Sequence, residues 1–414
     1  MTNRDIKRRE TFGLAAGSAA TFLLGSVAAS AQQAATVKIG VVIPLSGAFA
    51  STGENIKAGA DLAIEDINQA GGIKALGGAK LELVVADAED SADKAKNAAQ
   101  RLLSRERDLV GGMGAGFSGL TTVVTDLTER AELPWLTMAL ADSMTERGFR
   151  YLFEVSPIAS VIAREALPTV LQLAKNATGK QPTTVAVIAD SNLGIQAMAK
   201  TWRDGEFAKY NVKLVSERTF TPPLSDPTQL IEELRRNRPD FLFLLPSNLT
   251  DLKIMTDKLN EFGLGRGKLP TITIGGATGY PELLKISSPQ ILEGLLGIFA
   301  NWPGKAHEDL VKRFAARTGR PWMTDGALNG YGEVMIFRDA LEKAGVVDRR
   351  KVADEIRNMN STSGAADFFT GRLQWDAMGR RVDTKLVVLQ WQNGLPKTVH
   401  PADIATAKPV WGAA

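Results

Sequence analysis

Residues 109–148 read LVGGMGAGFSGLTTVVTDLTERAELPWLTMALADSMTERG, and this stretch decides the fold class. A short apolar run over 109–113 leads into a glycine-rich turn, after which apolar residues recur at helical spacing. A second apolar run over 133–138 follows the helix. The order of strand, turn, helix and strand is that of a βαβ unit, which predicts a parallel sheet covered by helices.

The glycine-rich turn supports three interpretations. In the first, Ser118 lies beside a helix N-terminus and the strand ends present bare backbone N–H groups, an arrangement that suits a small carboxylate. In the second, GAGFSG (114–119) is a G-x-G-x-x-G fingerprint with Asp142 at the end of the next strand, which is typical of a dinucleotide site. In the third, the turn binds no ligand.

Residues 1–31 have the pattern of a secretory signal peptide. A basic opening precedes a small, apolar run, and an A-x-A cleavage signal at 29–31 predicts that the mature chain begins at Gln32. The adjacent Arg8 and Arg9 hint at the twin-arginine route, while general secretion and a retained membrane anchor remain as alternatives. The pattern predicts an exported, periplasmic protein.

Composition narrows the functional classes. The chain has no cysteine, which excludes disulfides, thiolate metal sites and cysteine nucleophiles. Its two histidines, His307 and His400, lie far apart in sequence and neither has a neighbour at metal-ligand spacing, so we expect no metal and no cofactor. The 49 basic and 46 acidic residues nearly balance at a net charge of +3, which gives no case for nucleic acid binding.

The mature chain alternates strands and helices, and the pattern restarts once. One series of strands runs from 37–44 to 151–155, and a second from 184–189 to 271–274. We therefore predict an α/β fold of two doubly wound parallel-sheet lobes joined by a three-crossing hinge. The expected boundaries are 32–156 plus 291–371 for the first lobe and 157–290 plus 372–414 for the second, with crossings near 155–158, 291–301 and 371–387.

Five blocks of sequence carry a family resemblance. They are IGVVIPLSGAFASTGENIKAGADLAIEDINQAGGI (39–73), FSGLTTVVTDLTERAELPWLT (117–137), SMTERGFRYLFEVSP (143–157), DPTQLIEELRRNRPDFLFLL (226–245) and GRLQWDAMGR (371–380). In this order, over the whole mature chain, they are similar to the solute-binding proteins of ABC importers of the branched-chain amino acid (Leu/Ile/Val-binding) type. The resemblance implies the type I periplasmic binding fold, with the ligand in a cleft between the lobes.

The resemblance also implies the positions of the ligand-binding residues. In this family the loop after the first strand closes over the ligand, a hydroxyl after the third strand grips its carboxylate, and the turn after the fourth strand adds backbone contacts. Loops of the second lobe complete the site. The positions so implied here are Phe49, Ser51, Thr52, Ser118, Gly119, Ala139, Leu140, Ala141, Leu193, Ser247, Asn248 and Gly276. Simpler roles remain open: Phe49 as a loop anchor, and Ser118 as a helix N-cap.

Leu193 stands where the family commonly has an aromatic residue, and two further departures concern the ligand's amino group. The turn at 139–141 lacks the threonine that binds the ligand's amino group, and no carboxylate lies near Gly276, where the family keeps the partner of the ammonium. A buried ammonium without such a partner is costly. Either the ligand is a small aliphatic or aromatic acid without an α-amino group, or Asp325 or Glu54 supplies the charge from elsewhere.

We therefore expect the binding component of an ABC importer rather than an enzyme. It should capture a small carboxylate in the interlobe cleft, act as a monomer and deliver the ligand to a membrane permease. Two alternatives are a ligand-sensing receptor of the same fold for amides or urea, and an NAD-dependent oxidoreductase that uses the glycine-rich turn. Soluble nicotinamide cofactor is not expected after export, which weighs against the second.

Overall fold

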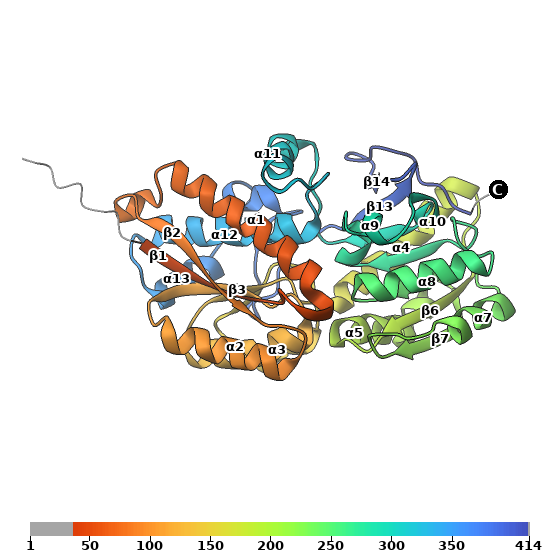
Figure 1. The fold of residues 1–414 in the computed structure, drawn as a ribbon, viewed down its shortest axis with the longest axis horizontal. Helices are drawn as coiled ribbons and strands as arrows, with labels where there is room; N and C mark the ends of the chain where they lie inside the picture. Colours follow the sequence, from red (N-terminus) through yellow and green to blue (C-terminus); the bar gives the residue numbers. More distant parts are fainter. Residues whose placement is uncertain (1–35, 413–414) are drawn as a thin grey trace, which may run out of the picture. The chain divides into compact units, whose positions relative to one another are not determined.

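The computed structural model describes residues 36–412, arranged around two large sheets (Figure 1). The predicted signal peptide, residues 1–31, lies outside this range. Among residues 36–412, no helix combines the length and the apolar character needed to cross a membrane.

The first lobe is built on a parallel sheet of five strands in the order β2-β1-β3-β4-β5. Their bounds are β1 (Thr36–Ile43), β2 (Lys80–Asp87), β3 (Leu109–Gly114), β4 (Trp135–Thr137) and β5 (Leu152–Glu154). The central strands β1, β3 and β4 are mostly apolar because helices cover both faces of the sheet. Figure 1 shows α2 (Ala92–Arg105) and α3 (Ser118–Arg130) on one face, and α1 (Ala50–Gln69) and α12 (Asp325–Ala344) on the other.

The second lobe is built on seven strands in the order β14-β13-β10-β9-β8-β6-β7. Their bounds are β6 (Thr184–Asp190), β7 (Lys213–Phe220), β8 (Phe241–Leu245), β9 (Thr271–Ile274), β10 (Leu296–Phe299), β13 (Val387–Gln392) and β14 (Leu395–His400). The last two form the antiparallel hairpin that Asn393-Gly394 indicates, with both turn residues at positive φ. Helices α4 (Ala159–Thr178) and α5 (Leu193–Thr201) cover one face, and α7 (Thr228–Asn237) and α8 (Leu249–Glu261) the other.

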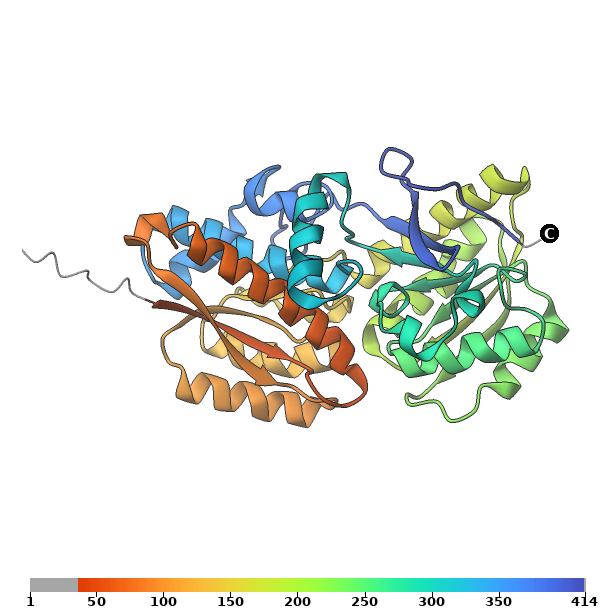
Figure 2. The same cartoon turned by 45° about the horizontal axis from the view of Figure 1, so that its top comes forward.

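Shorter elements complete the two lobes. They are a π-helical turn (Trp202–Glu206), α6 (Phe207–Lys209), α9 (Leu283–Ile286), α10 (Pro289–Leu292), α11 (Glu308–Thr318), α13 (Arg349–Arg357), β11 (Asn360–Ser361) and β12 (Leu373–Gln374). Helix α11 lies against α1 (Figure 2), where Arg313 pairs with Asp66 at 2.6 Å and Arg317 with Glu65 at 2.5 Å. The fold class predicted from the alternating pattern is confirmed.

The chain passes between the lobes three times, and two strand segments lie on the other side of the expected boundaries. Strand β10 pairs with β9 and β13 in the second sheet, although 291–371 was expected in the first lobe. Leu373 and Trp375 pack in the core of the first lobe, although 372–414 was expected in the second. Which sheet a short strand joins depends on pairing with distant strands, and local periodicity does not encode that pairing.

A buried arginine ties two of the crossings together. Arg381 donates through Nη1 to the Val155 carbonyl at 3.0 Å, and through Nη2 to the Thr370 carbonyl. Only 5% of Arg381 is exposed, and this burial lowers the pKa of its guanidinium to about 10. Trp375 adds a hydrogen bond of 2.8 Å from Nε1 to the Glu154 carbonyl. The first and third crossings are thus joined side by side.

Candidate ligand-binding site

A cavity of about 100 Å³ lies where the strands of both sheets end. Its lining residues follow β3, β4 and β5 in the first lobe and β6, β8, β9 and β10 in the second: Gly116, Met138, Ser156, Asn192, Pro246, Gly275 and Ala300. In open parallel sheets, ligands bind outside the carboxyl ends of the strands. The cavity therefore lies where a ligand is expected for each of the two sheets taken separately.

Ser118 lines this cavity and is almost fully buried. The part of the lining around it is called the Ser118 end. Its Oγ accepts hydrogen bonds from the backbone N–H groups of Leu140 at 3.2 Å and Ala141 at 3.1 Å. These two amides are therefore paired rather than bare, which corrects the sequence-based expectation. The N-cap of α3 is Phe117, so the interpretation of Ser118 as an N-cap is also wrong.

Unpaired donors remain at the start of α3. The first bond of the helix runs from the Thr121 N–H to the Phe117 carbonyl, so the N–H groups at 118–120 precede the intrahelical ladder. The hydroxyl of Ser118 accepts two bonds and still has its own proton to donate. A helix N-terminus also favours negative charge. This end of the cavity has the chemistry of a carboxylate site.

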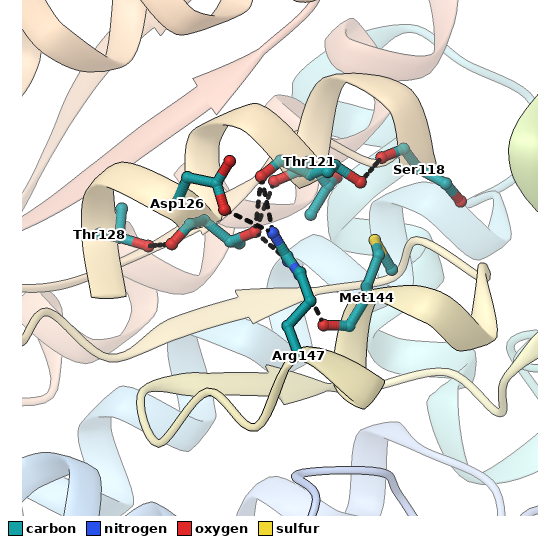
Figure 3. A network of polar contacts seen from close by, with 8 residues as sticks. Ser118, Thr121, Asp126, Thr128, Met144 and Arg147 are labelled. Carbon is teal, nitrogen blue, oxygen red and sulfur yellow. Dashed lines mark hydrogen bonds and ion pairs between the residues drawn. The ribbon is translucent and has the colours of Figure 1, made fainter. Parts of the chain in front are cut away.

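Arg147 holds the segment after β4 against α3 (Figure 3). Its guanidinium donates to the Thr122 carbonyl at 3.0 Å, to Asp126 at 2.9 Å and to the Thr125 hydroxyl at 2.6 Å. Its Nε donates to the Met144 carbonyl at 2.9 Å, within the 3-10 helix Asp142–Arg147. These bonds fix the strand end at 139–141 relative to the helix that carries Ser118.

Gly194, at the start of α5, brings the second lobe close to Ser118. A Cβ at this position would lie 3.0 Å from the Ser118 Oγ and 3.3 Å from the Leu140 Cβ. Asn192 caps α5 by accepting from the Gly194 N–H at 3.1 Å, and both residues line the cavity. The neighbouring Leu193, expected in the site, is 51% exposed and does not line the cavity, because its side chain points outward from α5.

Asp325 provides the only carboxylate among the described residues that line the cavity. It is the first residue of α12, after the N-cap Thr324, and 5% of it is exposed. Its Oδ1 has no hydrogen-bond partner among the described residues. Burial raises the pKa of this carboxyl to about 7, because removal from water disfavours the charged form.

Tyr280 lies next to Asp325 and explains why position 276 is a glycine. The Tyr280 hydroxyl donates to the Thr52 Oγ1 at 3.2 Å, which joins the segment after β9 to the start of α1. A Cβ at Gly276 would lie 2.2 Å from that hydroxyl oxygen. The place where the family resemblance put a carboxylate is therefore filled by the phenol of Tyr280.

The structure brings five of the twelve expected residues to the cavity and leaves seven outside it. Those lining it are Thr52, Ser118, Leu140, Ser247 and Gly276. Those outside it are Phe49, Ser51, Gly119, Ala139, Ala141, Leu193 and Asn248. Phe49 stacks on Phe117 with ring centroids 4.1 Å apart, which fits a loop anchor, and Asn248 caps α8 through the Asp251 N–H at 2.9 Å. Apart from Phe49, each of these seven residues has a sequence neighbour that lines the cavity.

Sequence reasoning missed most of the apolar lining and four polar groups. The apolar side chains at strand ends and on α4 are Met138, Ile162, Ile274, Ile298 and Phe299. The missed polar side chains are Ser156, Asn192, Tyr280 and Asn329. The first three follow β5, β6 and β9, and Asn329 lies on α12. The last position of a predicted strand was a usable signal for Met138 and Ile274. No local sequence pattern indicated that Asn329 lines the cavity, because the sequence of α12 is that of an ordinary buried helix.

The dinucleotide interpretation does not fit the geometry of the glycine-rich turn. Trp135 Nε1 donates to the Gly114 carbonyl at 2.8 Å, and the Ala115 N–H donates to the Thr121 hydroxyl at 3.1 Å. Asp142 accepts from the Ser160 N–H at 3.1 Å, at the start of α4. An engineered cavity of about 150 Å³ holds one benzene ring, so a cavity of about 100 Å³ suits a small molecule and not a dinucleotide.

Comparisons with known proteins agree with this geometry. The periplasmic binding protein family matches residues 36–396. Leu/Ile/Val-binding protein homolog 8 of Brucella melitensis is 26% identical over 393 residues, covering 90% of this chain and 93% of that protein.

Two solved structures share the fold. One is a branched-chain amino acid transporter substrate binding protein from Streptococcus pneumoniae in complex with isoleucine (TM-score 0.76, 18% identity, 88% of this chain and 100% of that one). The other is a solute binding protein of an ABC transporter from Rhodopseudomonas palustris in complex with 3,4-dihydroxybenzoic acid (TM-score 0.73, 19% identity, 91% and 98%). The chain thus belongs to the periplasmic binding protein family and is similar to the Leu/Ile/Val-binding proteins of ABC importers, as its sequence blocks predicted.

Proposed function

We propose that the protein is the exported binding component of an ABC importer, which captures a small carboxylate ligand in this cavity and delivers it to a membrane permease. The observation that carries the proposal is the cavity itself, at the carboxyl ends of both sheets, with Ser118 and the N-terminus of α3 at one end. Contacts from two lobes exist together only when the lobes close, so ligand binding favours the closed state.

The lining supports a ligand with an apolar body. Between its polar groups the cavity presents Met138, Ile162, Ile274, Ile298 and Phe299. A mostly apolar wall with a few placed polar groups is usual for small-molecule sites, where the polar groups fix orientation. An aliphatic or aromatic carboxylic acid meets both requirements.

Family membership supports the remaining parts of the proposal. A periplasmic location, with residues 1–31 as the signal peptide, and a permease as the partner both follow from the type of protein. We propose a monomer, because one chain contributes both walls of the cavity. The expectation of a ligand without an α-amino group rested on the missing carboxylate near Gly276, and Asp325 now provides a carboxylate at another place in the same cavity.

A thermal-shift panel on the mature chain tests the proposal. The ligands are leucine, isoleucine, benzoate, 3,4-dihydroxybenzoate and 4-methylpentanoate, with acetamide, urea and NAD as representatives of the alternatives. A ligand at 100-fold its Kd stabilises the folded protein by about 2.7 kcal/mol, which a melting curve resolves easily. We expect a shift with at least one of the carboxylates. Shifts confined to acetamide, urea or NAD would contradict the proposal.

A further inference from the structure

Asn329 is a buried asparagine that lines the cavity one helical turn after Asp325. Only 2% of the residue is exposed. Residues four apart lie on the same face of a helix, so these two side chains are neighbours in the cavity wall. The part of the lining formed by Asp325, Asn329 and Tyr280 is called the Asp325 end.

Asn301 fixes the direction in which the amide of Asn329 points. It follows β10, where the chain returns to the first lobe, and it is itself buried. Its Nδ2 donates to the Asn329 Oδ1 at 3.1 Å and to the Phe368 carbonyl at 2.7 Å. Because a backbone carbonyl can only accept, the NH2 end of Asn301 must face both partners. Asn329 must then present its oxygen to Asn301, since two amide NH2 groups make no hydrogen bond with each other.

The NH2 group of Asn329 is left on the other side of the amide. The bond from Asn301 is the only hydrogen bond of the Asn329 side chain among the described residues, so Nδ2 has no partner there. This nitrogen is not sealed off by surrounding protein atoms, and the residue lines the cavity. A donor at a cavity wall is satisfied by an acceptor that enters the cavity. Asn329 thus offers a hydrogen-bond donor of fixed direction at the Asp325 end.

We propose that Asn329 is a specificity-determining residue that donates a hydrogen bond to an oxygen on the body of the ligand, and that Asn301 is the positioning residue that aims this donor. The inference rests on the proposed function, in which the carboxylate of the ligand lies at the Ser118 end. A neutral keto, ether or hydroxyl oxygen then meets Asn329 and adds no charge beside the buried carboxyl of Asp325. Asn301 does not line the cavity, so it acts on the ligand only through Asn329.

Calorimetry with matched acid pairs tests the proposal at a pH near 7.5, where the carboxylates are ionised. Within each pair an oxygen-bearing group replaces a hydrocarbon group of similar size. The pairs are 4-oxopentanoate with 4-methylpentanoate, 4-methyl-2-oxopentanoate with 2,4-dimethylpentanoate, and 4-methoxybenzoate with 4-ethylbenzoate. A buried donor left without an acceptor lowers affinity by about fivefold or more. The wild-type protein should therefore bind the oxygen-bearing member of at least one pair about fivefold more tightly or better.

Variants at the two asparagines separate the donor from its support. Asn329→Ala removes the donor and should reduce the preference to within about twofold. Asn301→Ala leaves the donor but removes the bond that orients it, so the preference should fall in the same way. The double variant should lower the preference no further, because both changes act on one contact.

Asn248→Ala is the matched control. It removes another buried asparagine, which caps α8 and lies outside the cavity. This variant should leave the preference unchanged. Melting curves establish that all of the variants are folded. The ratio of the two affinities within a pair is the decisive quantity, since a purely structural loss weakens both members equally.

The other outcomes contradict the proposal in distinguishable ways. A wild-type preference that survives in Asn329→Ala would remove Asn329 from ligand selection. A preference that is lost in Asn329→Ala but kept in Asn301→Ala would overturn the positioning role of Asn301. If the wild-type protein binds carboxylates of the thermal-shift panel but prefers the oxygen-bearing member of no pair, only the role of Asn329 fails. If it binds no carboxylate at all, the proposed function fails as well.

Discussion

The Ser118 end and the Asp325 end of the cavity use polar side chains in opposite ways. At the Ser118 end the side-chain oxygens of Ser118 and Asn192 accept hydrogen bonds from the amides of 140 and 141 and of 194. At the Asp325 end a carboxylate oxygen is buried with no partner. Paired groups build the frame of a site, whereas an unpaired buried group marks where a ligand completes it. Four substitutions can break or sharpen this contrast.

The largest effect is expected from Gly194→Val, at the Ser118 end. A branched side chain would meet the Ser118 Oγ and the Leu140 Cβ, both already close to an added Cβ, and would keep the lobes apart. We expect ligand binding to weaken at least 100-fold, about 2.7 kcal/mol, as measured by calorimetry. Gly304→Val is the control, since a Cβ there meets nothing within 4 Å. Binding by Gly194→Val at wild-type affinity would mean that the close approach is not part of the bound state.

Ser118→Ala should weaken binding by roughly 1.5–3 kcal/mol, the range for a hydrogen bond to a charged group. It should also lower the free energy of unfolding by about 1–3 kcal/mol, because the amides of Leu140 and Ala141 lose their acceptor. Ser91→Ala is the control: it removes a helix cap far from the cavity and should lower stability by about 1 kcal/mol without changing affinity. Equal loss of affinity in both variants would show that Ser118 acts through stability alone.

At the Asp325 end the expected effect depends on pH. Burial raises the pKa of Asp325 to about 7 and that of Glu333, also on α12, to about 8. Both values exceed those of an unfolded chain, so the folded protein binds more protons and its stability falls as pH rises from about 4.5 to 8. Asp325→Asn should therefore raise the free energy of unfolding of the ligand-free protein by roughly 1–3 kcal/mol more at pH 8 than at pH 5. Denaturant titrations at the two pH values measure this; an equal gain at both would mean that Asp325 does not titrate in this window.

The smallest effect is expected from Tyr280→Phe, which removes the hydrogen bond to Thr52. The loss of one neutral hydrogen bond should weaken ligand binding by about 0.5–1.5 kcal/mol. Thr52→Val and the double variant complete a cycle, in which the two single effects should not add, because both remove the same bond. Full additivity would mean that the Tyr280 contact makes no contribution to the closed state.

The fold and the residues of the Ser118 end could be predicted from the sequence, whereas the Asp325 end was predicted only in part. The strands, the hairpin at Asn393-Gly394 and the helix after β3 follow from local periodicity and turn chemistry, and they are confirmed. Ser118, Leu140 and Gly276 line the cavity because they lie within four residues of the carboxyl ends of β3, β4 and β9. Asp325 was named only as an alternative, because its position depends on α12 returning to the first sheet from the second lobe. Tyr280 was missed for a related reason: its contact with Thr52 joins segments distant in sequence.

The hydrogen bonds of Arg381 have a consequence for ligand release in the proposed function. Two linkers joined through one buried guanidinium twist together, so their torsions are shared rather than independent. If the protein works as proposed, the resistance of this joined pair to twisting would affect how quickly the lobes part, whereas the cavity side chains would set how tightly the ligand is bound. Substitutions at the joined linkers would then change the rate of ligand release without changing which ligand the cavity selects.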